Sequence, residues 1–385
     1  MKKLIKYIFS ITCKFLILKK RNKEDNKKKH KVLVSYIIKP FLSQKSNTHS
    51  NLQEARCIIE SISEMGYDID ICDYRNRRKL NYKKYHVIFG FGYHLEKAIK
   101  ENTKCKIIHY ATGMPQYFQN IASIKRIKDF KEKNDILALD SARLSFEQHI
   151  LQEYLSDGII SIGGKDTHGK FKELNKNIIE IDTTYIDYGY REEILNSRNI
   201  EKNKKNFLWL GGPGAIHKGL DLLIELFSDD SQIEFNDAEL HIVGNIENEP
   251  AFFDYMKEKI KVRENIFYYG YQNIESESML SIFKKCVFAI LPSCSEGQAT
   301  SIINCVGNGG LIPIVSKNGG NDKDYTIYIE DLTIESIKKS MISVINLTNN
   351  EIKFKQDHAI SSVIENNNLN KFKEKFKSAF RELTD

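Results

Sequence analysis

The sequence predicts an α/β protein built from two similar domains, and three observations lead to this prediction. At 385 residues, the chain is too long for one ordinary compact domain and suits two domains of roughly 150–180 residues each. Hydrophobic residues make up 41% of the chain and aromatic residues 11%, which is enough to form two cores. Short apolar runs alternate with helical patterns along both halves, and this alternation indicates parallel sheets covered by helices on both faces.

The first half opens with a strand, a loop, a helix and a second strand, which is the start of a βαβ unit. The apolar run at 31–38 is followed by the helical pattern NLQEARCIIESISEMG and by the predicted strand YDIDICDY. Further strands are expected at HVIFGFG, KCKIIHYATG and DGIISIGG, with a polar helix around 124–133. We therefore assign residues 31–180 to a first Rossmann-like domain.

The second half repeats this order of elements without repeating the sequence, so we expect a second similar fold and not a solenoid. An irregular, charged linker at 181–206 comes first, and strands and helices then alternate from NFLWLGG to VFAILP. We assign residues 207–350 to a second Rossmann-like domain and residues 351–385 to a C-terminal helical segment.

The N-terminal segment, residues 1–30, carries much of the net charge of +7. Wound as a helix, residues 1–20 place lysines on one face and five apolar side chains on the other, namely Leu4, Ile8, Ile11, Phe15 and Leu18. This run is too short and too charged to span a bilayer, and no cleavage signal follows it. We expect residues 1–20 to bind an anionic membrane surface, with packing on the protein's own body as the alternative. Residues 21–30 would form a solvated tether.

Composition and spacing argue against several other classes of function. Without the N-terminal segment the chain is close to neutral, so no nucleic-acid partner is expected. Seven cysteines without a CxxC pair indicate free thiols in a reducing compartment, on the cytoplasmic side. Asp68 and Asp70 resemble an Asp-x-Asp metal motif, but they lie inside a predicted strand with no second acidic cluster nearby. We therefore expect neither a metal nor a cofactor.

A glycine-rich turn is the first candidate ligand site. The segment LWLGGPGAIHKGLDLL places Gly211 and Gly212 between a strand and a helix, where backbone N–H groups can bind a phosphate. Lys218 adds a positive charge. A plain turn between a strand and a helix explains the glycines about as well, because a lone GxG pattern is weak evidence.

The segment PSCSEGQATSIINCVGNGG is the stronger signal. Glu296 is expected just before a helix that would open with the N–H groups of Gly297, Gln298 and Ala299, and Asn304 follows eight residues after Glu296. At about 1.5 Å per residue, the Glu296 and Asn304 side chains would stand ~12 Å apart on similar sides of the helix. This is roughly the span from the hexose to the ribose of a nucleotide sugar. A carboxylate that only complements the helix dipole is the alternative, and the nearby glycine turn favours the ligand site.

These segments resemble the donor-binding half of the group 1 family of retaining glycosyltransferases, which have the GT-B fold and a motif of Glu, seven residues and Glu. The matching stretches are NFLWLGGPGAIHKGLDLLIELF, LHIVG, NIFYYGY and LPSCSEGQATSIINCVGNGG. Upstream, THSNLQEARCIIESISEMGYDIDICDY, KIIHYATGMPQYFQN and DGIISIGG are similar to the acceptor half of bacterial members that build surface polysaccharides. The resemblance covers most of residues 31–330 and implies two Rossmann-like domains facing each other across a cleft.

The resemblance implies a role for each matching residue. Glu296 would contact hydroxyls of the donor sugar and Lys218 would lie on the diphosphate, so these two are the expected catalytic residues. No protein nucleophile would be needed, because an oxygen of the donor phosphate takes the acceptor proton while the protein stabilises charge on the departing diphosphate. Gly270 and Tyr271 would meet the nucleotide base, with a buried aromatic residue as the alternative for Tyr271. The full donor-binding set is Gly211, Gly212, His217, Lys218, Gly270, Tyr271, Glu296, Gly297, Gln298, Ala299, Thr300 and Asn304.

Two positions depart from the family pattern. The second Glu of the motif is Asn304 here, which can bond ribose hydroxyls but carries no charge. The family often has an Arg six residues before the lysine, and this chain has Gly212 at that position. Lys218 would then neutralise the diphosphate with help from the backbone, from His217 or from a residue of the other domain. These two departures are also compatible with an inactive or slow enzyme.

In the first domain, polar residues follow the carboxyl ends of predicted strands, where ligands of open α/β sheets collect. The acceptor-side candidates are His49, Asn51, His109, Thr112 and Gly113, with ordinary loop polarity as the alternative explanation. The resemblance implies an enzyme of bacterial surface polysaccharide synthesis, and the basic N-terminal segment would place it at the cytoplasmic face of the membrane. It would move a sugar from a nucleotide sugar to a saccharide or lipid-linked acceptor. A nucleotide-sugar 2-epimerase and a non-catalytic scaffold subunit are the alternatives.

Overall fold

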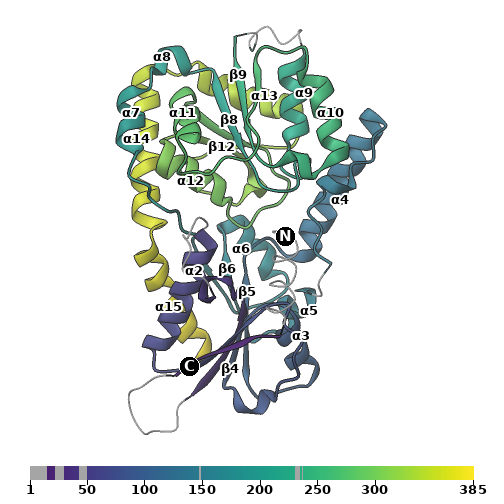
Figure 1. Ribbon diagram of the computed structural model, residues 1–385, viewed down its shortest axis with the longest axis vertical. Coiled ribbons are helices and arrows are strands. Elements are labelled where there is room, and N and C mark those ends of the chain that lie inside the picture. Colours follow the sequence, from purple (N-terminus) through teal and green to yellow (C-terminus); the bar gives the residue numbers. More distant parts are fainter. Residues whose placement is uncertain (1–14, 22–29, 43–49, 147–148, 230–234, 236) are drawn as a thin grey trace.

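The computed structural model describes residues 15–21, 30–42, 50–146, 149–229, 235 and 237–385. In these ranges the chain forms two sheets, stacked along the long axis of the molecule and covered by helices (Figure 1). The first sheet has seven strands in the order β1-β3-β2-β4-β5-β6-β7, and the second has six in the order β10-β9-β8-β11-β12-β13. Neighbouring strands are parallel except for β1 and β3. These two sheets confirm the predicted α/β class.

The first sheet forms from apolar runs that are buried along almost their whole length, as in KVLVSY and GIISI, which is typical of a parallel sheet covered on both faces. Its strands are β1 (Ile17–Lys20), β2 (Lys31–Tyr36), β3 (Asp68–Asp73), β4 (Val87–Gly90), β5 (Lys106–Ala111), β6 (Gly158–Ile162) and β7 (Ile178–Ile181). The helices between them are α2 (Ser50–Glu64), α3 (Tyr93–Lys100), α4 (Gln116–Asn134), α5 (His149–Leu155) and α6 (Lys165–Lys172).

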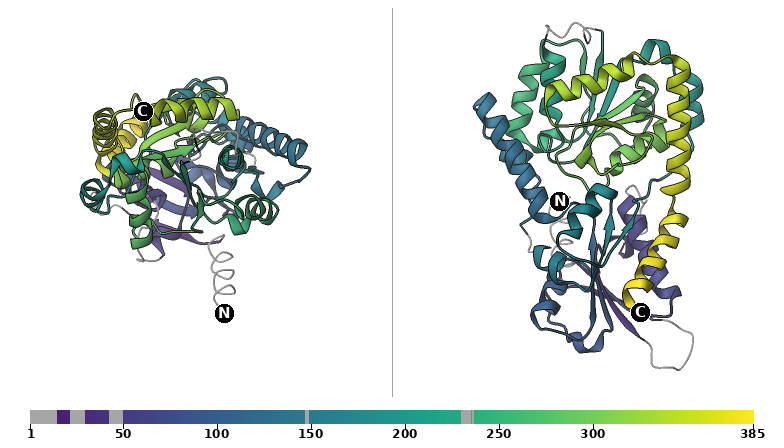
Figure 2. Two further views of the ribbon diagram at one scale, coloured as in Figure 1. Left: turned by 90° about the horizontal axis from the view of Figure 1, so that it is seen from above. Right: turned by 180° about the vertical axis from the view of Figure 1, so that it is seen from behind.

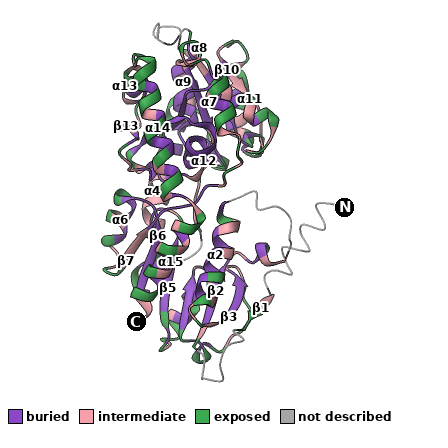
Figure 3. Ribbon diagram, turned by 90° about the vertical axis from the view of Figure 1, so that its left-hand side faces the viewer, coloured by how far each residue is buried: buried purple, intermediate pink, exposed green. Residues whose placement is uncertain are grey.

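The second sheet is built in the same way, and burial is concentrated in the strands and in α12 (Figure 3). Its strands are β8 (Asn206–Leu210), β9 (Glu239–Val243), β10 (Ile266–Tyr268), β11 (Phe288–Leu291), β12 (Ile312–Ser316) and β13 (Ile327–Ile329). Its helices are α9 (Leu220–Ser228), α10 (Pro250–Ile260), α11 (Glu277–Lys285), α12 (Thr300–Gly309) and α13 (Ile334–Ile345). The stretch 181–206, expected to be irregular, contains α7 (Arg191–Ser197) and α8 (Ile200–Asn203).

The N-terminal segment ends in a strand and not in a helix. Residues Ile17–Lys20 pair with β3 in antiparallel register, and Ile17 and Leu18 pack against different core clusters, as alternating side chains of a strand do. The helical prediction is therefore wrong for these four residues, because pairing with the sheet edge outweighs the helical periodicity. Residues 1–14 lie outside the described residues, so membrane binding through residues 1–20 stays a prediction. Among the described helices, none is both long and apolar enough to cross a membrane.

Asp70 of β3 binds donors from three segments of the first domain. Arg21 Nη2 lies 2.8 Å and Lys31 Nζ 2.9 Å from its carboxylate oxygens, and the Tyr85 hydroxyl donates to it at 2.8 Å. Arg21 is therefore not part of a solvated tether. Burial alone would raise the pKa of Asp70, but the hydrogen bonds from Lys31, Arg21 and Tyr85 outweigh burial and lower the pKa to about 2. In the part of the chain that the structure describes, no group of three or more His, Cys, Asp or Glu residues is placed to hold a metal ion.

This ion cluster predicts an acid-dependent loss of stability. The folded-state pKa of Asp70 is below its unfolded value, so its contacts stabilise the fold above roughly pH 4 and are lost as the pH falls toward the folded pKa of about 2. We expect Asp70→Asn to melt at a lower temperature than the wild type at pH 7 and to show a flatter decline between pH 4 and pH 2. Thermal melts across this range measure the effect, with Asp254→Asn, an exposed carboxylate near Lys257, as the control. Parallel acid profiles for the wild type and Asp70→Asn would contradict the prediction.

The last two helices connect the second domain back to the first. Helix α14 (Asn349–Asn366) packs beside α12, and α15 (Leu369–Thr384) returns to the first sheet (Figures 1 and 2). Phe372, Phe376 and Phe380 are spaced four residues apart, so they share one helix face, and they are buried in the core of the first sheet. The C-terminal helix is thus part of the first domain's core.

Helix α4 leaves the first sheet and runs along the side of the second domain (Figure 1). The Phe130 ring packs against Phe252 and Tyr255 of α10, with ring centroids 5.9 and 4.9 Å apart. Arg126 forms a buried ion pair with Asp221 of α9 at 2.5 Å. We refer to residues 116–143 as the α4 arm. This arm belongs to the N-terminal half of the sequence and docks on the C-terminal domain.

Candidate functional site

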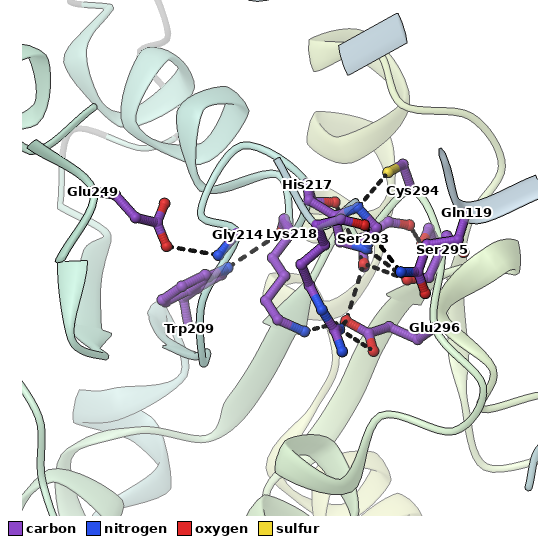
Figure 4. Close-up of polar contacts among 12 residues, drawn as sticks. Gln119, Trp209, Gly214, His217, Lys218, Glu249, Ser293, Cys294, Ser295 and Glu296 are labelled. Carbon is purple, nitrogen blue, oxygen red and sulfur yellow. Dashed lines mark hydrogen bonds and ion pairs between the residues drawn. The ribbon is translucent and has the colours of Figure 1, made fainter. Parts of the chain in front are cut away.

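Glu296 lies at the centre of a group of charged residues where the two domains meet (Figure 4). Lys218 forms an ion pair with its Oε1, and Arg143 Nη1 lies 3.2 Å from Oε1 and 3.0 Å from Oε2. The Ser293 hydroxyl donates to Oε1 at 3.3 Å. We call Glu296, Lys218 and Arg143 the Glu296 cluster. It contains both residues that the sequence singled out as catalytic, together with an arginine from the α4 arm.

The charges of the Glu296 cluster stabilise one another. Burial alone would raise the pKa of Glu296, but the charges of Lys218 and Arg143 hold the pKa well below its usual range. Burial lowers the pKa of Lys218 although Glu296 opposes that change. Because the Glu296 carboxylate has two cationic partners, it is ionised at neutral pH. Loss of either cation would leave a buried charge incompletely paired.

The loop that carries Glu296 contacts the first domain at Gly297. The Gly297 carbonyl accepts a hydrogen bond from Thr167 Oγ1 at 2.9 Å. A Cβ on Gly297 would lie 2.8 Å from the Ile162 carbonyl oxygen and 2.9 Å from Gly113 Cα, so a larger residue does not fit. Gly297 therefore allows the loop to lie against the strand ends of the first domain.

Helix α12 begins at Thr300, with Ala299 as its N-cap, so the prediction that Gly297, Gln298 and Ala299 open the helix is wrong. The physical reason is the contact of this loop with the first domain. Gln298 Nε2 donates to Asp182 at 3.1 Å, and its Oε1 accepts from the Thr183 N–H at 2.7 Å. Both polar atoms of the Gln298 side chain therefore bond the segment that directly follows β7.

Asn304 is bonded within its own helix. Its Nδ2 donates to the Thr300 carbonyl at 2.9 Å and its Oδ1 accepts from Asn308 Nδ2 at 3.3 Å. These two bonds use one N–H and one lone pair of the amide, so one donor and one lone pair stay available for a ribose hydroxyl.

The glycine-rich turn binds an internal carboxylate (Figure 4). The N–H groups of Gly214 and Ala215 donate to Glu249 at 2.6 and 2.8 Å, and the Gly211 N–H donates to the Val243 carbonyl at 3.0 Å. The turn thus presents the N–H groups of Gly214 and Ala215 to an internal carboxylate, and phosphate binding at Gly211 and Gly212 stays a prediction. Gly212 is exposed, and a Cβ there would meet no atom within 4 Å.

His217 joins the glycine turn to the Glu296 loop. Its Nε2 lies 2.7 Å from the Ser295 carbonyl and its Nδ1 lies 3.3 Å from Cys294 Sγ. Burial lowers the pKa of His217 to about 4, so the ring is neutral and cannot add charge on a diphosphate. A direct donor contact would require these bonds to break.

The predicted base contact lies in an open part of the second domain. Gly270 has a φ of +66°, which glycine adopts without strain, and its carbonyl accepts from the Gly244 N–H at 3.0 Å. Tyr271 is 62% exposed, so the alternative of a buried aromatic residue is wrong. Its ring is accessible for stacking on a base.

Three acceptor-side candidates border one pocket. His109, Thr112 and Gly113 line a pocket of about 200 Å³ at the carboxyl ends of β4 and β5. Other lining residues include Gln116, Gln119, Arg143 and Glu153. Asn51 is exposed at the start of α2 and does not line this pocket, and His49 lies outside the described residues. Because Arg143 lines the pocket and also bonds Glu296, the pocket adjoins the Glu296 cluster.

Arg143 is the site residue that the sequence did not identify. Its segment, SARLSF, has no glycine turn, helix start or strand end that would mark it. From the sequence we expected only that some residue of the other domain would assist Lys218. In the structure, Arg143 lies where it can do so.

Comparison with known proteins gives the family of the second domain. Residues 191–355 match the family model described as Glycosyl transferases group 1. The chain carries a glycosyl transferases group 1 domain. A search of curated proteins finds no match.

Solved glycosyltransferase structures share the fold over nearly the whole chain. A glycosyltransferase from Rickettsia africae is 15% identical with a TM-score of 0.56, covering 93% of this chain and 99% of its own. Sucrose-phosphate synthase from Thermosynechococcus elongatus is 11% identical with a TM-score of 0.61, covering 92% and 99%. HepE from Anabaena, in complex with UDP and glucose, is 8% identical with a TM-score of 0.57, covering 92% and 100%. This likeness confirms the GT-B fold, and with the domain match it makes the chain a glycosyltransferase.

Proposed function

We propose that this glycosyltransferase moves a sugar from a nucleotide sugar to a saccharide or lipid-linked acceptor, with retention of configuration, in bacterial surface polysaccharide synthesis. The observation that carries this proposal is the position of the Glu296 cluster beside the pocket of the first domain. Arg143 belongs to both, so a donor held at the cluster would present its sugar to an acceptor in the pocket. The basic N-terminal segment would hold the enzyme at the cytoplasmic face of the membrane.

On the donor side, the Glu296 cluster supplies the groups that a nucleotide sugar requires. Lys218 and Arg143 match the negative diphosphate, and the Glu296 carboxylate can accept hydrogen bonds from sugar hydroxyls. The exposed Tyr271 ring offers a surface for the base. HepE, which shares the fold, is described in complex with UDP and glucose, so a uridine diphosphate sugar is the first donor to test.

On the acceptor side, the pocket is lined by groups that bind hydroxyls. His109 and Glu153 are buried residues of its wall, and Glu153 Oε1 accepts from the Gln116 N–H at 2.9 Å. In the proposed reaction, an acceptor hydroxyl oxygen bonds to the anomeric carbon while the bond from that carbon to the phosphate oxygen breaks. The hydroxyl proton passes to a phosphate oxygen, and the departing diphosphate takes up negative charge beside Lys218 and Arg143.

Glu296 and His217 do not favour the 2-epimerase alternative. Acid–base chemistry needs a group that exchanges protons near neutral pH. Glu296 is held ionised by two cations and His217 is buried with its ring nitrogens occupied. The scaffold alternative rests on two departures from the family pattern, Asn304, whose amide is bonded within α12, and Gly212, which stands where the family often has an arginine.

Donor binding tests the proposal directly. We expect one of the UDP-, GDP-, ADP- or CMP-linked sugars to raise the melting temperature of the wild type without added metal, because a ligand that binds the folded state stabilises it. Lys218→Ala should lose this shift, because the cation expected on the diphosphate is gone, whereas Lys339→Ala, which removes an exposed lysine of α13, should keep it. A screen in which neither a nucleotide sugar nor a free nucleotide shifts the wild type would remove the proposed donor site.

Turnover separates the enzyme from a scaffold. The stabilising donor is incubated with saccharide and lipid-linked acceptors, and release of the nucleoside diphosphate is followed. Release that depends on an acceptor supports transfer. Donor binding without release or hydrolysis under any of these conditions would favour the scaffold subunit.

A further inference from the structure

We infer that Arg143, delivered by the α4 arm, is a second ligand of the donor diphosphate, and that Glu296 occupies this diphosphate subsite until a donor enters. The inference rests on the proposed donor function and deepens it. It assigns the subsite to two cations from opposite halves of the sequence, and it assigns to Glu296 a change of partner when the donor binds.

The geometry of the Glu296 cluster is that of an anion site. Lys218 and Arg143 converge on one carboxylate, and the Arg143 guanidinium bonds both of its oxygens, at 3.2 and 3.0 Å. A phosphate also presents several anionic oxygens, and arginine and lysine bind phosphate and carboxylate by the same kind of charge-assisted hydrogen bond. A diphosphate oxygen can therefore take the place of the Glu296 carboxylate.

Arg143 is held in place before any ligand arrives. Its N–H donates to the buried Ser123 hydroxyl at 2.9 Å, and its carbonyl accepts from Gln119 Nε2 at 2.9 Å. Both partners belong to α4, whose far end is docked on the second domain through Phe130. The backbone of Arg143 is thus fixed by the arm, while its side chain remains 40% exposed and accessible to a ligand.

The α4 arm and the glycine-rich turn contact each other at Arg143. A Cβ on Gly214 would lie 2.8 Å from Arg143 Cγ, so the turn passes close to the stem of the arginine because residue 214 has no side chain. The Ser141 hydroxyl donates to Glu249 at 2.6 Å, and the same carboxylate accepts from the Gly214 N–H at 2.6 Å. These contacts fix the distance between Arg143 and the turn that carries Lys218.

Charge balance favours the use of both cations. The diphosphate of a nucleotide sugar carries two negative charges, and Lys218 can balance one of them. Nearby cations are already paired, Arg126 with Asp221 at 2.5 Å and Lys323 with Asp182 at 2.8 Å. When Lys218 and Arg143 move to phosphate oxygens, the Glu296 carboxylate is released toward the hydroxyls of the donor sugar.

Binding of inorganic pyrophosphate and of UDP tests the subsite without the donor sugar. At low ionic strength we expect the wild type to bind both, and Arg143→Ala to weaken both by roughly 10-fold or more, the usual effect of losing one charge-assisted contact. Arg143→Lys keeps the positive charge but lacks the planar guanidinium group, so its affinity for both ligands should lie between those of the wild type and Arg143→Ala. Arg78→Ala, which removes an exposed arginine of the same domain, is the matched control and should bind like the wild type.

Hydrogen exchange gives a second readout that does not depend on affinity alone. Pyrophosphate should slow amide exchange in residues 139–146 of the wild type and leave this segment unchanged in Arg143→Ala. Equal pyrophosphate and UDP affinities in the wild type and Arg143→Ala would overturn the inference while the donor site of the proposed function stands. Pyrophosphate binding that depends on Arg143 in a protein that binds no nucleotide sugar would support the subsite and overturn the proposed function. Absence of pyrophosphate binding to the wild type would overturn the subsite.

Discussion

Replacement of Lys218 by alanine is expected to lower kcat/KM for sugar transfer by ~10²–10³-fold, the usual cost of removing one group that stabilises charge developing in the transition state. Lys218 is 8% exposed and forms an ion pair with Glu296. In the proposed reaction it faces the departing diphosphate from a largely buried position, where its charge is less screened than at the surface. Initial rates of nucleoside diphosphate release, measured with a saturating acceptor, give the effect.

Two controls separate lost chemistry from lost structure. Lys339→Ala removes an exposed lysine of α13 and should leave the rate unchanged. The melting temperature of Lys218→Ala shows whether the partly unpaired Glu296 has destabilised the fold. A folded Lys218→Ala variant with a rate within about threefold of the wild type would rule out Lys218 as the main charge on the leaving group.

Replacement of Phe376 by alanine is expected to cost about 3–5 kcal/mol of folding free energy, the range for truncating a fully buried phenylalanine. The Phe376 ring lies between Phe372 and Phe380 and packs edge-on against Phe89 of β4, with ring centroids 5.4 Å apart. The cavity left by the missing ring would therefore lie in the core of the first sheet, whose strands are far from α15 in the sequence. Urea unfolding followed by circular dichroism measures the loss.

The region that Phe376→Ala destabilises is as informative as the loss of folding free energy. Glu374→Ala, an exposed position two residues away, is the control and should change stability by less than about 0.5 kcal/mol. Amide exchange in Phe376→Ala should quicken in β2, β3 and β4 more than in the second sheet. Faster exchange confined to α15 itself would mean that the helix is a peripheral addition and not part of this core.

The two sheets were predictable because their signal is local. Apolar runs of strand length alternate with helical patterns, and each run can be assigned without knowledge of its partners. The partners themselves were not predictable in the same way. The periodicity of residues 1–20 fits a helix, yet Ile17–Lys20 is a strand because β3 offers an open edge, and the sequence contains no sign that α15 returns to the first sheet.

The site shows the same division. Lys218 and Glu296 lie in segments whose glycines and polar residues are close together in the sequence, so their chemistry could be inferred. Arg143 lies 153 residues from Glu296, and nothing near it in the sequence records their contact. The start of α12 was misplaced for a related reason, since Gly297 and Gln298 are held by Thr167 and Thr183 of the first half.

The return of α15 also affects the order in which the protein can form during synthesis. The strands of the first sheet leave the ribosome early, but the phenylalanines that complete their core follow only with residues 369–384. At about 5–20 residues per second, the interval from Ile181 to Leu369 takes roughly 10–40 s. For that time the nascent first domain has an uncovered apolar face, so chaperones would have a binding surface there, and a ribosome that stops before α15 would release a chain whose second domain can fold before its first.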